Sequence, residues 1–250
     1  MSKQVLNDKT FSSETVAEFT GGRPVSRTMS YGGTGIRAGF LLVVTIAFAM
    51  LGWRWAAAVV TTSGLWFFLG YIGLIALSLA AAANPKLAPV AGLAYAVLMG
   101  LWMGAISRIY ESYYDGIVGQ ALLASVATFL ACLLLYVFRV IRVTGKFVRV
   151  VVIATFGVLL MYLAGWILSI FGIGLRFWTH PSKLGIGISV VVCIVAALNL
   201  ILDFGVIEAG VTQGAPASME WYAAFGLLTT LVWLYLEILY LLVRVRAASQ

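Results

Sequence analysis

The carboxylates of this chain are few and unevenly placed. Of nine Asp and Glu residues, three lie in the first 36 positions, and Glu111 and Asp115 lie in a short polar stretch, YESYYDG. The rest fall in or between the last two apolar segments: Asp203, Glu208, Glu220 and Glu237. Glu237 stands inside the apolar run LVWLYLEILYLLV, with no charge nearer than Arg244. A carboxylate inside a bilayer costs about 2.5–3.5 kcal/mol, so it usually has a function and a partner.

Asp203 is the candidate partner of Glu237, and Asn199 lies one helical turn before Asp203. Two carboxyl groups that meet in a dry site cannot both ionise cheaply, and they titrate as a unit. Such a pair predicts either a pH switch or a site where both carboxylates bind a hard cation through their oxygens. The helical period puts more polar side chains on the stripe that carries Glu237: Thr230, Tyr240 and Arg244.

Two simpler arrangements stay open. Asp203 could lie close enough to the end of its segment to be solvated, and Glu237 could pair with Arg244. Depth also matters, because folding two antiparallel helices about residue 214 places Asp203 level with Thr229 or Thr230. Glu237 is then offset by about seven residues, roughly 10 Å along the helix.

The elements that position these residues are apolar segments of membrane length. The chain is 62% hydrophobic and 10% charged, with a mean hydropathy of +1.04. A soluble domain has about 25% charged residues, so a soluble fold and a disordered chain are excluded. About 20 apolar residues cross a bilayer. Seven such segments are predicted, at about 37–56, 60–83, 88–109, 117–138, 149–172, 184–208 and 221–243.

Residues 1–36 form a predicted polar, flexible tail before the transmembrane domain at 37–250. The net charge is +7, but the basic residues lie in the tail and at helix ends, so we expect no nucleic-acid partner. Counting bases on alternate loops gives ten on the side of the N-terminus and six on the other. By the positive-inside rule the N-terminus is cytoplasmic. The side on which the C-terminus lies depends on the exact number of helices.

No catalytic constellation is evident. The chain has no HExxH, GxSxG or P-loop motif and no Cys/His cluster, so we expect neither an enzyme nor a resident cofactor. Its single histidine, His180, lies beside a proline in a predicted loop and is read as a surface residue. Glu208 and Glu220 flank the last loop, where a solvated face is favoured over an acidic vestibule. Gly100 and Gly104 form a GxxxG motif that predicts close packing inside the bundle.

The final segment, MEWYAAFGLLTTLVWLYLEIL from Met219, resembles the last helix of bacterial members of the Bax inhibitor-1 (YccA-like) family. Shorter stretches are also similar to the family: GAISRIYE from Gly104, IRVT from Ile141 and NLILD from Asn199. The resemblance spans about residues 37–243 and leaves the tail outside. It implies an all-α membrane protein, a seven-helix bundle with the last helix at its centre, in the bacterial cytoplasmic membrane.

The family is associated with a pH-sensitive calcium leak that depends on one acid in each of the last two helices. Those positions fall on Asp203 and Glu237, and many members have Asp at the second one. The resemblance therefore implies a calcium or cation leak channel gated by this pair. Two alternatives stay open. One is a membrane-embedded regulator that binds other membrane proteins, such as a quality-control protease. The other is a proton-coupled transporter of small solutes.

Overall fold

The computed structural model describes residues 27–61, 65–171 and 182–249. Over these ranges the chain is helical, with no strand beyond an isolated bridge between Thr28 and Pro216. The elements in order are α2 (Tyr31–Thr61), α3 (Leu65–Ala83), the 3₁₀ turn η1 (Pro85–Leu87), α4 (Ala88–Tyr113), α5 (Ile117–Val137), α6 (Gly145–Ile170), α8 (Lys183–Thr212) and α9 (Met219–Ala248). Among the described residues, six helices are long and apolar enough to cross a membrane: α2, α4, α5, α6, α8 and α9. An all-α integral membrane protein is confirmed, while seven crossings and a central last helix stay predictions.

Helix α2 begins at Tyr31, six residues before the segment expected from hydropathy. The Ser30 side chain explains this start, because its hydroxyl accepts the backbone N–H of Gly33 at 3.0 Å. Serine in that position is a strong N-cap, so the YGGTG sequence forms the first turns of a helix. Residues 31–36, expected to belong to the tail, are helical, and residues 1–26 lie outside the described part.

The chain divides into two compact units. Among the described residues, the first contains 114–171, 182–204 and 230–249, and the second contains 27–61, 65–113 and 205–229. Helices α8 and α9 contribute residues to both. The predicted acidic pair therefore belongs to the first unit, and Glu208 and Glu220 belong to the second.

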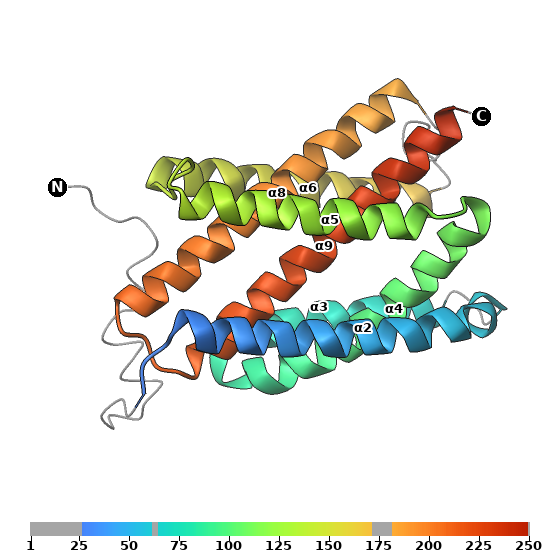
Figure 1. Cartoon of the computed structure of the whole chain (residues 1–250). Coiled ribbons are helices and arrows are strands. Elements are labelled where there is room, and N and C mark those ends of the chain that lie inside the picture. Colours follow the sequence, from blue (N-terminus) through green and yellow to red (C-terminus); the bar gives the residue numbers. More distant parts are fainter. Residues whose placement is uncertain (1–26, 62–64, 172–181, 250) are drawn as a thin grey trace. The chain divides into compact units, whose positions relative to one another are not determined.

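In the second unit, α2 packs along α4 (Figure 1) through the GxxxG motif. A Cβ on Gly100 would collide with the backbone oxygen of Thr45, and one on Gly104 would collide with that of Ala49. Glycine is required at both positions because the two backbones touch. The prediction that this motif packs within the bundle is confirmed.

The second unit also joins the segment before α2 to the loop between α8 and α9. Two backbone hydrogen bonds make this junction: Met29 N–H to the Ala215 oxygen at 2.7 Å, and Ala217 N–H to the Arg27 oxygen at 3.0 Å. Beneath them Met29 and Ala215 are buried with Met219 and Ala223. The loop that connects the last two helices is therefore held by the N-terminal segment.

In the first unit, α6, α8 and α9 share an apolar core. Val158, Val192 and Val195 are buried at its centre, and Tyr162 and Trp233 pack against them. The core therefore holds the hydrogen-bonding ends of Tyr162 and Trp233 close to the carboxyl group of Glu237.

Candidate functional site

Asp203 lies on α8 and contacts α9. The Thr230 hydroxyl donates a hydrogen bond to its carboxyl group. The second oxygen, Oδ2, is buried and accepts no hydrogen bond from any described residue. The level of the contact agrees with the depth expected for two antiparallel helices. A buried carboxyl oxygen without a donor is uncommon in folded proteins and needs a physical reason.

Asn199 does not bond to the neighbouring acid. Its amide donates to Thr155 Oγ1 on α6 at 2.7 Å and to the Val195 oxygen at 2.8 Å. Asn199, expected to support Asp203, instead links α8 to α6 through Thr155, one turn before Asp203 on α8.

Glu237 lies on α9, two turns after Thr230, and is 5% exposed. Its Oε1 atom accepts two hydrogen bonds: one from the Tyr162 hydroxyl at 2.5 Å and one from Trp233 Nε1 at 3.0 Å. Trp233 is one turn earlier on the same helix, whereas Tyr162 belongs to α6. Two neutral donors therefore hold this carboxyl inside the apolar core.

Arg244, another polar residue of the stripe, lies near Glu237 and directs its hydrogen bonds elsewhere. The Arg244 guanidinium donates to the Gly185 oxygen at 3.0 Å and to Ser189 Oγ at 2.5 Å, both on α8. The positive charge of Arg244 interacts electrostatically with the Glu237 carboxyl group. Tyr240 has an electrostatic interaction with Tyr162. Glu237 and Arg244 form no ion pair among the described residues. The simpler arrangement, in which Glu237 pairs with Arg244, is therefore not observed.

The two carboxyls thus have separate partners. Asp203 is held by Thr230 and Glu237 by Tyr162, and no hydrogen bond joins the acids. Thr230 and Glu237 are seven residues apart on α9, which corresponds to roughly 10 Å of helix. No group of three or more Asp, Glu, His or Cys side chains that could hold a metal occurs within the described ranges. The first unit therefore contains two acid–hydroxyl pairs, Asp203 with Thr230 and Glu237 with Tyr162, at two positions along α9.

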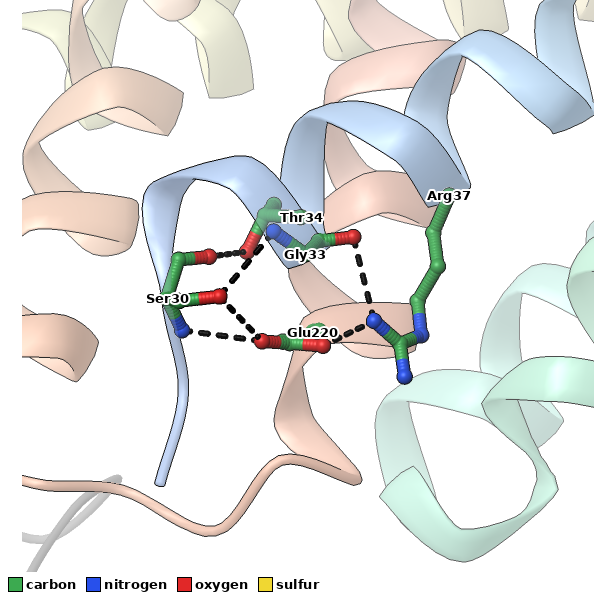
Figure 2. Close-up of polar contacts among 5 residues, drawn as sticks. All are labelled: Ser30, Gly33, Thr34, Arg37 and Glu220. Atoms are coloured by element: carbon green, nitrogen blue, oxygen red, sulfur yellow. Dashed lines mark hydrogen bonds and ion pairs between the residues drawn. The ribbon is translucent and has the colours of Figure 1, made fainter. Parts of the chain in front are cut away.

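Glu220 corrects an expectation. It was expected on a solvated loop face, yet it is 4% exposed and lies in the first turn of α9. Figure 2 shows its carboxylate between Arg37 and Ser30 of the α2 end. Oε2 pairs with the Arg37 guanidinium, and Oε1 accepts the Ser30 N–H at 2.8 Å and the Ser30 hydroxyl at 3.0 Å. A buried carboxylate is stable there because a cation and two dipoles neutralise it. Glu208, part-buried on α8, keeps a polar interaction of its own.

The cluster around Glu220 is closely packed. The Arg37 guanidinium also lies over the Trp221 ring, 5.5 Å from its centre, and donates to the Gly33 oxygen at 3.1 Å. A Cβ on Gly33 would collide with the Glu220 carboxylate, so glycine makes the approach of α9 to α2 possible. We call Ser30, Gly33, Arg37 and Glu220 the α2–α9 cluster.

Sequence reasoning missed Tyr162 and the α2–α9 cluster. A signal existed for the cluster, because the expected topology places the start of the first helix and the last loop on one membrane face. Arg37 and Glu220 are opposite charges at those two places. Tyr162 offered only a hydroxyl in the middle of an apolar segment, which does not specify a partner. His180 lies outside the described residues.

A family model described as "Bax inhibitor 1 like" matches residues 3–247. The match includes most of the tail, which the resemblance of single segments had left outside. No curated protein and no solved structure matches the chain.

Proposed function

This chain belongs to the Bax inhibitor 1 like family of membrane proteins, and on that premise we propose that it is a pH-sensitive leak for calcium or another cation. Asp203 and Glu237 form its gate. The observation that carries the proposal is the buried Oδ2 of Asp203, which no described residue satisfies. A carboxyl in that position gains a proton or a cation at low cost, because either one removes an uncompensated buried acceptor.

Protonated, the two acids are neutral, and the seam between α8 and α9 stays closed. Ionised, each carboxylate is unfavourable in an apolar interior and favours an arrangement that admits water or a cation. Calcium coordinates carboxylate and hydroxyl-type oxygens, so Asp203 with Thr230 offers one step of a path and Glu237 another. Because Thr230, the partner of Asp203, lies two turns before Glu237 on α9, the gate uses two successive oxygen sites. The interior holds few other polar groups, so conduction is slow.

The proposed setting is the bacterial cytoplasmic membrane with the N-terminus in the cytoplasm. Calcium is the cargo and is not a bound cofactor. The protein is proposed to act without catalysing a reaction.

The test is calcium flux into liposomes that contain the purified protein, across pH 6 to 8. Asp203→Asn and Glu237→Gln should each flatten the pH dependence, because neither variant can change charge at that position. Asp115→Asn is the matched control, since Asp115 is an exposed loop acid. The proposal fails if the parent carries no calcium at any pH, or if all four proteins have the same pH profile.

A further inference from the structure

Glu237 is joined to a helix other than the one that carries Asp203. Tyr162 donates a hydrogen bond to the Glu237 carboxyl group from α6 at 2.5 Å. The Tyr162 ring packs against the buried core cluster of Val158, Val192 and Val195, which restricts its movement. The hydroxyl therefore cannot leave Glu237 by a simple rotation without disturbing this core.

The other groups around Glu237 lie on its own helix or interact with it only electrostatically. On α9 itself, Trp233 donates at 3.0 Å, and Arg244 acts through its field while bonded to α8. Tyr240 interacts with Tyr162, and Cys193 is the titratable side chain that α8 places within electrostatic range. Among the described residues, Tyr162 is the hydrogen-bond donor that reaches Glu237 from another helix.

The length of the side chain at position 237 matters for this bond. An aspartate there would withdraw its carboxyl by about one C–C bond, roughly 1.5 Å. The separation from the Tyr162 hydroxyl would grow to about 4 Å, beyond hydrogen-bond range. Glutamate at this position thus fits a partner on α6.

We propose that Tyr162 is a positioning residue of the gate, which holds Glu237 between α6 and α9 and makes α6 a third moving part. This inference rests on the proposed leak function. When Glu237 changes charge, the change is transmitted to α6 through the Tyr162 hydroxyl, while Asp203 acts on α8 and α9 through Thr230.

The experiment is a pair of double-mutant cycles in calcium flux. Tyr162→Phe should raise the flux several-fold at the pH where the parent is closed, because the carboxyl loses its tether to α6. Glu237→Asp should do the same, since it keeps the acid and loses the reach. In a Glu237→Leu background, where position 237 has no acceptor for the Tyr162 hydroxyl, Tyr162→Phe should add little, whereas with Asp203→Asn the two effects should multiply. Tyr136→Phe on α5 is the control for loss of a tyrosine hydroxyl.

A second readout is the coupling in thermal unfolding of the same proteins, which needs no flux. A coupling between Tyr162 and Glu237, and none between Tyr162 and Asp203, is expected. If that coupling is absent, or if Tyr162→Phe conducts like the parent while the parent conducts, the positioning role is overturned. If no protein conducts but the coupling is present, the leak function fails and the contact between Tyr162 and Glu237 stands.

Discussion

Glu220 and Arg37, 183 residues apart in the chain, form an ion pair between the first turn of α9 and the second turn of α2, in which the Glu220 carboxylate is buried and Arg37 is part-exposed. Ser30 donates two further hydrogen bonds to the Glu220 carboxylate, one from its backbone N–H and one from its hydroxyl (Figure 2). The start of the helix that carries Glu237 is therefore anchored to the start of the first described helix. The anchor and the carboxyl lie on one continuous α9.

Arg37→Gln should lower the stability of the folded protein. Glu220 would keep the Ser30 donors, but its buried carboxylate would have no cation to neutralise it. Because Arg37 is part-exposed, we expect a loss of about 2 kcal/mol, less than for a fully buried pair. Thermal unfolding in detergent measures it. Arg54→Gln, at an exposed arginine, is the control, and equal unfolding temperatures for both variants would contradict the anchor.

Gly33→Ala should destabilise the protein, although alanine normally favours a helix by about 1 kcal/mol over glycine. The added methyl group collides with the Glu220 carboxylate and must displace it from Arg37. Gly32→Ala is a matched control one residue earlier, because no atom lies within 4 Å of its Cβ position. We expect a lower unfolding temperature for the first variant and an unchanged or higher one for the second. The reverse order would show that α9 does not approach α2 at Gly33.

Thr230→Val should change the pH profile of calcium flux, because Asp203 loses the donor that Thr230 supplies. A hydrogen bond to a buried carboxyl contributes about 1–2 kcal/mol, so a several-fold change in flux is expected. Thr229→Val is the neighbouring control, since the Thr229 hydroxyl bonds to the Gly226 oxygen of its own helix. Parent-like flux from Thr230→Val would remove Thr230 from the gate.

The N-terminal region separates the leak from the partner-binding alternative. Deletion of residues 2–26 should leave calcium flux unchanged if the protein is a leak. Deletion through residue 30 should alter flux for a different reason, because Arg27 and Met29 hold the loop between α8 and α9. If the shorter deletion abolishes the activity, the tail is needed for function and the regulator becomes the better explanation.

Helix positions were predictable because hydropathy decides which segments enter a bilayer, and the seven expected segments overlap the seven described helices. The depth of Asp203 followed from helix geometry alone, which predicted Thr229 or Thr230 as its neighbour. The start of α2 was missed because a serine cap and two glycines look polar in composition. Tyr162 was missed because a partner on another helix depends on packing, which spacing within one helix does not encode.

The most direct test of the leak is the ratio of calcium flux at pH 8 to that at pH 6, for the parent and for the double variant Asp203→Asn/Glu237→Gln. Proteoliposomes of equal protein content, with Asp115→Asn beside them, make the comparison fair. A ratio clearly different from one in the parent and in Asp115→Asn, and close to one in the double variant, is what a gate made of two acids predicts. A double variant that keeps the parent ratio would contradict it.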